Sequence, residues 1–476
     1  MDIQHLSIEH LREKLAEDSF SLEDLSSAVE QRCNNIQKHF NAFTSLNSYL
    51  SSDIKALKGF TAENSSLPLA GVPYILEDTI CTTQMKSTCS SKFLSSFVPP
   101  FDAHVHSILR EKGAVLTGKG NTEEFALGSS GDSSYFSSPL NPWNKENIAG
   151  SGAAAAVSAG GAVIGLGVDT NGELRQSAAF NGVFALKPSY GKISRRGVIG
   201  YSPSLEQVGI YARSTPDLAT ALEHITVLDE KDPTCIKSEI PSYTSLLREI
   251  LPTLTVAVPE DWETSFVHKA TAENFKRFIE QLRNFEIEVK YVPLNYYKYS
   301  STAASVISAV EAFSTLSNLD GVRFGLREEG KHLQDMYLQT RSNGFSSKLK
   351  KFLGFGALAS REDYYNPCFR QSQKLRSLIK QEIEDCLNTY DLLLTPTTPF
   401  ASPALNESKS FSLPEATAYY TSSANLTGYP ALQMPLTAPG TLPLGVQFLG
   451  QENEEVLLLK LSFLLEKEMF LYQPEI

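Results

Sequence analysis

The N-terminal part of the chain has an apolar residue at every third or fourth position. Ile8, Leu11 and Leu15 share one face of a helix, and the same spacing resumes after Ser21. Ser21 is followed three residues later by Asp24, a spacing typical of a capping box at a helix start. The pattern predicts two helices that pack on the outside of the main body.

Short apolar runs closed by turn residues begin near residue 69 and alternate with amphipathic stretches. The runs read as strands are residues 70–76, 114–118, 162–168, 392–394 and 444–449. The stretches read as helices are residues 104–112, 153–159, 272–285 and 371–387, with a further Leu-rich helix at the C-terminus. Apolar strands that alternate with helices indicate an α/β fold whose sheet is covered on both faces.

Strand-like runs near both ends favour one sheet and therefore one domain over residues 1–476. We divide it into N-terminal helices (1–65), a core (66–230), a mostly helical insertion (231–390) and C-terminal strands with a helix (391–476). The Ser/Pro-rich stretch 402–414 reads as a long surface loop.

Composition narrows the class of protein. With 42% hydrophobic and 20% charged residues, the chain of 476 residues is neither disordered nor collagen-like. The net charge of -12 would repel polyphosphate, so we expect no direct DNA contact, and tRNA contact only through partners. The six cysteines lack metal-ligand spacing and read as free thiols in a reducing compartment. We expect a cytoplasmic protein with no membrane span and no cofactor.

Two turns stand out as places for chemistry. The loop from Gly150 to Gly152 opens an alanine-rich helix, whose free N–H groups could hold an anion. The buried strand 162–168 ends in the turn of Asp169, Thr170, Asn171 and Gly172, which would expose backbone N–H groups at the carboxyl end of the sheet. Active sites of α/β proteins commonly lie there.

In chain order, these turns and several other segments resemble the amidase signature family, and within it the A subunits of the tRNA-dependent amidotransferases. The matching segments are residues 69–73, 118–126, 149–157, 169–176, 185–191, 204–209 and 394–399. The resemblance covers nearly the whole chain. It implies an α/β/α sandwich around a large mixed sheet, and a pocket in which a serine attacks an amide, activated by a lysine through a second, cis-bonded serine.

The residues of that machinery are replaced here. The family's K-D-N-I pattern reads Glu77-Asp78-Thr79-Ile80, so an acid stands where the lysine should be. The family's D-T-G-G-S-I-R-Q pattern reads as residues 169–176, which puts Glu173 at the nucleophile and leaves Thr170, Asn171 and Gly172 as a vestigial oxyanion hole. Ala149 occupies the position of the cis-serine, and Ser151, two residues on, is at most a partial substitute.

Substrate recognition is also altered. The resemblance places an aspartate that receives the amino group of glutamine before a V-N-L-A-G segment, and Ala418 stands there. An arginine for the substrate carboxylate should fall near residues 350–352. Lys348, Lys350 and Lys351 form a short basic run that reads as solvated surface rather than as an anion site.

Three interpretations of function remain. The first is a non-catalytic relative that keeps the scaffold and binds amidotransferase partner subunits or a ligand. The second is a repurposed site, in which Glu77 and Glu173 form a carboxylate pair or, with Asp78 and Asp169, bind a hard cation. The third is a working A subunit of a glutamyl-tRNA(Gln) amidotransferase, which would pass amide nitrogen to a kinase-like partner.

A purely structural role for the two glutamates also stays open. Glu173 would then accept hydrogen bonds from the old oxyanion N–H groups, and Glu77 would pair with a basic residue.

Overall fold

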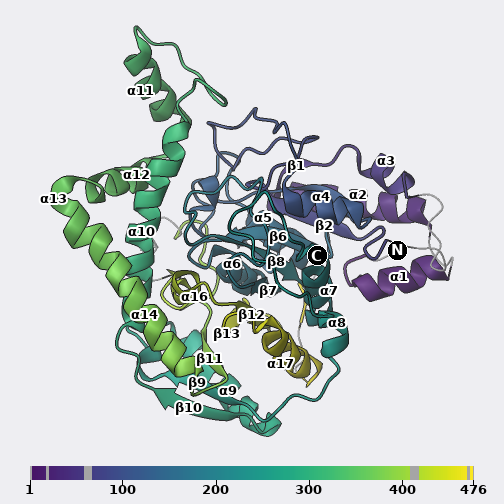
Figure 1. The fold of residues 1–476 in the computed structure, drawn as a ribbon. Helices are drawn as coiled ribbons and strands as arrows, with labels where there is room; N and C mark the ends of the chain where they lie inside the picture. The colour runs from purple at the N-terminus through teal and green to yellow at the C-terminus, as the bar shows by residue number, and fades with distance from the viewer. Residues whose placement is uncertain (1–2, 18–20, 58–66, 408–416, 469–471, 475–476) are drawn as a thin grey trace.

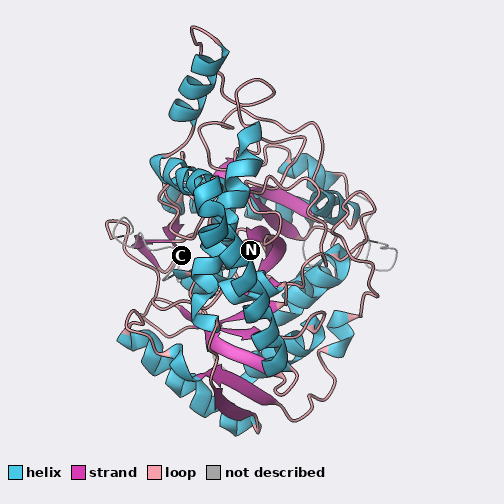
Figure 2. Cartoon of the chain, turned by 60° about the vertical axis from the view of Figure 1, so that its left-hand side comes forward, coloured by secondary structure: helices cyan, strands magenta, loops and turns pink. Residues whose placement is uncertain are grey.

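The computed structural model describes residues 3–17, 21–57, 67–407, 417–468 and 472–474. Its centre is an 11-stranded mixed sheet with the strand order β1-β3-β2-β6-β8-β7-β12-β13-β11-β9-β10. The strands are β1 (Phe43–Leu46), β2 (Pro73–Glu77), β3 (Val115–Gly120), β6 (Ile164–Asp169), β7 (Phe184–Lys187), β8 (Gln207–Ala212), β9 (Thr255–Pro259), β10 (Glu288–Val292), β11 (Leu392–Pro396), β12 (Ala431–Leu436) and β13 (Leu444–Leu449). The sheet runs through the middle of the molecule, with helices around it (Figures 1 and 2).

Every residue of β2, β3, β6, β7, β8 and β13 is buried, although side chains alternate between the two faces of a strand. Both faces of the sheet are therefore covered, which confirms the predicted α/β fold. The central pairs of β2 with β3 and β6 are parallel, whereas β8 pairs antiparallel with β6 and β7. A separate antiparallel pair consists of β4 (Leu140–Asn141) and β5 (Asn144–Ile148).

The first helices follow the sequence pattern closely. Helix α2 begins after Ser21, whose side chain accepts from the backbone N–H of Asp24 while Asp24 accepts in return, so the predicted capping box is present. The helices of the first half are α1 (Ile8–Ala16), α2 (Leu22–Phe40), α3 (Leu50–Lys55), α4 (His104–Glu111), α5 (Gly152–Ser158), α6 (Glu173–Asn181) and α7 (Thr215–Ile225), with the short η1 (Glu124–Ala126).

The helices of the second half include a group that packs together beside the sheet, formed by α10, α12 and α14. The elements are α8 (Tyr243–Leu246), η2 (Glu260–Trp262), α9 (Lys269–Leu282), η3 (Arg283–Phe285), η4 (Tyr297–Tyr299), α10 (Ser300–Thr315), η5 (Leu316–Asn318), α11 (Leu333–Gly344), α12 (Ser347–Ala359), α13 (Glu362–Tyr365), η6 (Asn366–Arg370), α14 (Gln371–Leu387), α16 (Ser422–Thr427) and α17 (Glu455–Glu468). In the described part of the chain, none of these helices is long and apolar enough to cross a membrane.

The segment 231–390 is mostly helical, and it also contributes β9 and β10, which extend the central sheet beyond β11. One expectation is wrong. The stretch that begins at Ser402 is not a surface loop at its start, because Ser402 is buried and its carbonyl accepts a hydrogen bond from the Asn147 side chain at 2.6 Å. Residues 408–414 of that stretch lie outside the described residues. All six cysteines are free, as expected.

Candidate functional site

The predicted site lies at the carboxyl ends of two neighbouring parallel strands. β2 ends at Glu77 and β6 ends at Asp169, so both residues reach the same edge of the sheet. After Asp169 the chain turns through residues 170–172 into α6, which starts at Glu173. Gly172 has a φ of 106°, and a Cβ at this position would lie 2.1 Å from the Thr421 side chain. The turn is therefore open to glycine alone, for both backbone and packing reasons.

The carboxyl group of Glu173 accepts hydrogen bonds from the turn that precedes it. One carboxylate oxygen accepts the backbone N–H of Thr170 at 2.9 Å and that of Asn171 at 2.7 Å. The other oxygen accepts the hydroxyl of Tyr201 at 3.4 Å. The expected hydrogen bonds from these two backbone N–H groups to Glu173 are present. The resemblance assigns the same N–H groups to the stabilisation of an oxyanion.

The side chain of Glu173 is buried. Burial raises its pKa to about 7, and the negative charge of Asp169 acts in the same direction, although the two N–H donors oppose it. Tyr201 is fully buried, and the ring of Phe352 on α12 packs edge-on against it at 6.2 Å between centroids. The Tyr201 ring therefore lies between the carboxyl group of Glu173 and the ring of Phe352 on α12.

Glu77 is held by neutral donors. Its carboxylate accepts the Ser151 hydroxyl at 2.8 Å, the backbone N–H of Val168 at 2.9 Å and the Tyr211 hydroxyl at 3.3 Å. Burial raises the pKa of Glu77 to about 7. The expected basic partner is wrong, since the groups that bind this carboxylate are two hydroxyls and an amide. Ser151 thus contacts the residue that stands in place of the family's lysine, and its hydroxyl donates a hydrogen bond to that residue's carboxyl group.

Ala149 is buried and carries no polar group at the position of the second serine. Its carbonyl accepts the side-chain amide of Asn181 at 2.6 Å, which fixes the loop before α5 against α6. The resemblance implies a hydrogen-bonded relay that runs from a lysine through one serine to a second serine. Glu77, Ala149 and Glu173 cannot form this relay, because none of them is a lysine or a serine.

The two glutamates do not share a hydrogen bond. They are connected only indirectly, because Ser177 donates to the Glu173 carbonyl and contacts the Tyr211 hydroxyl at 2.9 Å, which in turn reaches Glu77. Each carboxylate has its own set of donors, which differs from the close carboxylate pair of the second interpretation.

The neighbouring aspartates are bound elsewhere. Asp78 accepts the Thr88 hydroxyl and lies 4.0 Å from the ammonium of buried Lys119. Asp169 binds Arg175 through both oxygens, each at 2.9 Å. Burial acts to raise the pKa of Asp169, but the Arg175 guanidinium outweighs it and the pKa lies below its ordinary value. Among the described residues, no three His, Cys, Asp or Glu side chains come together as metal ligands.

The substrate-recognition positions also have internal contacts. Ala418 is buried, and its carbonyl accepts the backbone N–H of Ser422 at 3.1 Å. Lys350 donates to the Ser342 carbonyl at 2.9 Å. Lys348 is not a solvated surface lysine, because its ammonium contacts the buried carboxylate of Glu123. The basic run is thus partly used to hold α12 on the body.

Sequence reasoning missed the aromatic and cationic residues that complete the site, namely Tyr201, Tyr211, Phe352 and Arg175. Arg175 stands in the quoted segment 169–176 beside an acid, so an ion pair with Asp169 was detectable. The three aromatic residues come from distant segments and gave no local signal.

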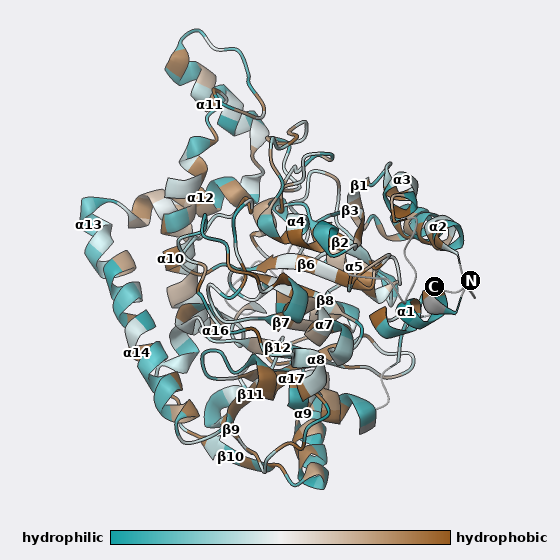
Figure 3. Cartoon of the chain, turned by 45° about the vertical axis from the view of Figure 1, so that its right-hand side comes forward, coloured by the Kyte–Doolittle hydropathy of each residue, from teal (hydrophilic) through white to brown (hydrophobic). Residues whose placement is uncertain are grey.

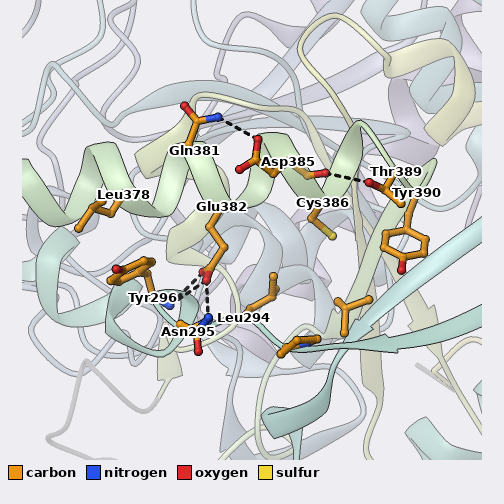
Figure 4. A pocket seen from close by; sticks show the side chains of 12 residues that line it. Leu294, Asn295, Tyr296, Leu378, Gln381, Glu382, Asp385, Cys386, Thr389 and Tyr390 are labelled. Carbon is orange, nitrogen blue, oxygen red and sulfur yellow. Dashed lines mark hydrogen bonds between the residues drawn. The ribbon is translucent and has the colours of Figure 1, made fainter.

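A cavity of about 480 Å³ lies away from this site, between the end of β10 and α14 (Figure 4). Glu382 joins its two walls, because its carboxylate accepts the backbone N–H groups of Tyr296 and Tyr297, each at 3.0 Å. None of the site residues predicted from the sequence lines it.

The buried glutamates predict a pH-dependent stability. Between pH 4.5 and about 7 the folded chain keeps the Glu173 proton that the unfolded chain has released, so stability falls as pH rises through this window. Glu173→Gln stays neutral and preserves the acceptor for both N–H groups. In urea unfolding, we expect the variant to match the native protein at pH 5 and to exceed it by about 1–3 kcal/mol at pH 8. The exposed control Glu273→Gln should show no such difference, and an equal effect of Glu173→Gln at both pH values would refute the assignment.

Known proteins resemble this chain over nearly its whole length. A family model described as Amidase matches residues 24–459. The A subunit of glutamyl-tRNA(Gln) amidotransferase from Carboxydothermus hydrogenoformans is 34% identical over 480 residues, 98% of each chain. The protein of that name from Pseudomonas fluorescens is 36% identical over 469 residues, 97% of this chain and 96% of its own. The crystal structure of the A subunit from Thermotoga maritima superposes with a TM-score of 0.83 at 30% identity, over 100% of this chain and 99% of that one.

Proposed function

Because the chain belongs to the amidase signature family, we propose that it is an A-subunit-like protein that binds amidotransferase partner subunits and no longer hydrolyses amides by the serine mechanism. The observation that carries the proposal is the position of Glu173. Its carboxylate stands where the nucleophile should be and accepts the N–H groups of Thr170 and Asn171. A carboxyl group in this hole already occupies both donors, and above its pKa of about 7 its negative charge also opposes the oxyanion that amide attack would create.

Two further observations support the loss of hydrolysis. Glu77 replaces the lysine and accepts a hydrogen bond from Ser151, and position 173, where the resemblance places the nucleophile, has no hydroxyl to activate. Ala149 and Ala418 lack the polar groups that the serine relay and the binding of a substrate amino group would need. Catalytic groups of this kind act as a unit, so the loss of several removes most of the rate.

The scaffold, by contrast, is kept along its whole length. Full-length relatives at 34–36% identity are named as A subunits, which describes a component of an assembly. Function follows the residues of a site, but a surface that binds a partner can outlast the site. We place the protein in the cytoplasm, in keeping with its free thiols.

The second candidate function is a working A subunit of a glutamyl-tRNA(Gln) amidotransferase, and the names of the relatives favour it over the first. It would need a nucleophile at a position other than 173. The carboxyl group of Glu173 is buried and already accepts both N–H groups of the hole, so it is not free to attack a substrate. Ser177 donates to the backbone carbonyl of Glu173, whereas Ser151 donates to the carboxyl group of Glu77, so Ser151 is the serine with a base in reach and the replacement nucleophile that this function would use.

The test mixes the full chain with the partner subunits of a glutamyl-tRNA(Gln) amidotransferase, purified without their A subunit, and follows the mass of the complex and the ammonia released from glutamine. We expect a stoichiometric complex that releases no ammonia. The chain should also compete with an active A subunit for the same partners and thereby lower glutaminase activity. Absence of any complex would refute the proposal, and partner-dependent ammonia release would establish the second candidate.

A further inference from the structure

A second, smaller core adjoins the closed site, separate from the main core around the sheet. Tyr201, whose hydroxyl donates to Glu173, belongs to this second core. Cys89 and Phe125 join it from two loops, and Leu353 joins it from α12. The closed site is therefore bordered by two loops and one helix on the side away from the sheet.

One of these loops, residues 121–139, here called the cover loop, reaches the turn of the closed site. The hydroxyl of Ser129 in the loop donates to the side-chain oxygen of Gln176 at 2.6 Å. The Gln176 amide donates in turn to the carbonyl of Asn171 at 3.3 Å, and the N–H of Asn171 binds Glu173. The cover loop is thus connected directly to the turn that holds the Glu173 carboxyl group.

Helix α12 holds the cover loop from the other side. The ammonium of Lys348 contacts the carboxylate of Glu123, which is fully buried, and lies 3.1 Å from Asp132. The backbone N–H of Ser346, just before the helix, donates to the Glu124 carboxylate at 3.0 Å. Helix α12 itself packs along α10 (Figures 1 and 3). The loop is therefore attached to a fixed support.

The backbone of the cover loop is strained where it meets the second core. Phe125 and Ala126 have φ values of 57° and 55°, in the left-handed region that non-glycine residues rarely adopt. The N–H of Phe125 donates to the carbonyl of Cys89, and Cys89 and Ser90 have φ values of 52° and 50°. Such conformations persist only where surrounding contacts enforce them. Release of these contacts would therefore favour a different loop conformation.

The length of the cover loop also sets it apart. It connects β3 to β4, and within its residues, all of which the structure describes, η1 is the only helix or strand. Its middle reads Gly128-Ser129-Ser130-Gly131, and Gly131 has a φ of 65°. Loops of this length are uncommon inside a compact domain, and many of them are lids or binding loops.

We propose that the cover loop is a gate over the closed site and that Lys348 of α12 holds it shut. Without this cation the buried Glu123 carboxylate is unpaired, and the loop moves off the turn of Glu173. Opening admits a small molecule to the turn while the sheet stays folded. The inference goes beyond the proposed function, and its test needs no partner subunit.

Two native cysteines report on the gate. Cys89 is fully buried in the second core, whereas Cys33 is buried on α2 in the main core. Burial holds the pKa of the Cys89 thiol well above its ordinary value, so alkylation requires opening. The test treats the full chain with iodoacetamide and follows both cysteine peptides by mass spectrometry. We expect Cys89 to react at least about tenfold faster than Cys33, because local opening is easier than global unfolding.

Three variants test what holds the gate. Lys348→Met removes the cation and should accelerate alkylation of Cys89 a further tenfold or more, roughly, with Cys33 unchanged. Ser129→Ala removes the contact with Gln176 and should accelerate it about fivefold. The matched control is Lys350→Met, since Lys350 lies on the same helix and donates to the Ser342 carbonyl. Its rates should equal those of the native chain.

Hydrogen exchange locates the movement. In Lys348→Met, we expect faster amide exchange across residues 121–139 and unchanged exchange in α10. Faster exchange in α12 with an unchanged loop would overturn the gate, because the helix would then be the part that moves.

The remaining outcomes also decide the proposal. Equal alkylation rates of Cys89 and Cys33 in the native chain would overturn it, because the second core would then open only on global unfolding. A faster Cys89 that neither Lys348→Met nor Ser129→Ala accelerates would overturn the role of these contacts and with it the proposal. If Lys348→Met accelerates both thiols, the variant has destabilised the whole chain, and the native rates and Ser129→Ala decide instead.

Discussion

Replacement of Arg175 by Met is expected to lower the free energy of unfolding by about 3–5 kcal/mol, the cost of leaving a buried charge unpaired. Arg175 and Asp169 are both fully buried. The guanidinium binds both Asp169 oxygens and also donates to Gln447 and Asn425, each at 2.8 Å. The variant would leave the Asp169 carboxylate inside the core with the Asn425 amide as its remaining side-chain donor.

Urea unfolding of the native protein, Arg175→Met and the double variant Asp169→Asn/Arg175→Met measures this effect. The double variant should recover part of the loss, because it removes the uncompensated charge along with the cation. A single variant within about 1 kcal/mol of the native protein would mean that water reaches Asp169, and the turn that presents the Thr170 and Asn171 N–H groups would then not be rigidly buried.

The sequence was sufficient to locate the turn after β6 and to find the replaced residues. Segment 169–176 is continuous, so its comparison with the family pattern needs no tertiary information. The capping box at Ser21, helix Gln371–Leu387 and strand Leu444–Leu449 were likewise readable, because each depends on local spacing. The interpretation of Glu173 as a hydrogen-bond acceptor followed from its position beside backbone N–H groups.

Contacts between distant segments could not be predicted from the sequence. The partners of Glu77 come from positions 151, 168 and 211. Nothing in the sequence around Ser151 or Tyr211 indicates that their hydroxyls donate to a carboxyl group. The covering of Glu173 by Tyr201 and Phe352 depends on how α12 packs on the body. β10 was missed because it is an edge strand whose residues are mostly exposed, so it lacks the apolar run by which the central strands were found.

The second large effect concerns amide hydrolysis itself. We expect the native protein to release ammonia from glutamine at least about 10⁵-fold more slowly than an active A subunit does, since the loss of a serine or its base alone costs about this much. The replaced positions are Glu77, Ala149 and Glu173. The variant Glu77→Lys/Ala149→Ser/Glu173→Ser restores all three groups, and any turnover it gains would come from a scaffold that still holds the turn in place.

Turnover of glutamine and simple amides tests directly whether the carboxyl group of Glu173 closes the old oxyanion hole. It is measured for the native protein, with and without partner subunits, beside Glu173→Gln and the triple variant. We expect no turnover above background for the native protein and for Glu173→Gln under every condition. Native turnover that disappears in Glu173→Gln would contradict this expectation, because Glu173 would then perform chemistry instead of filling the site.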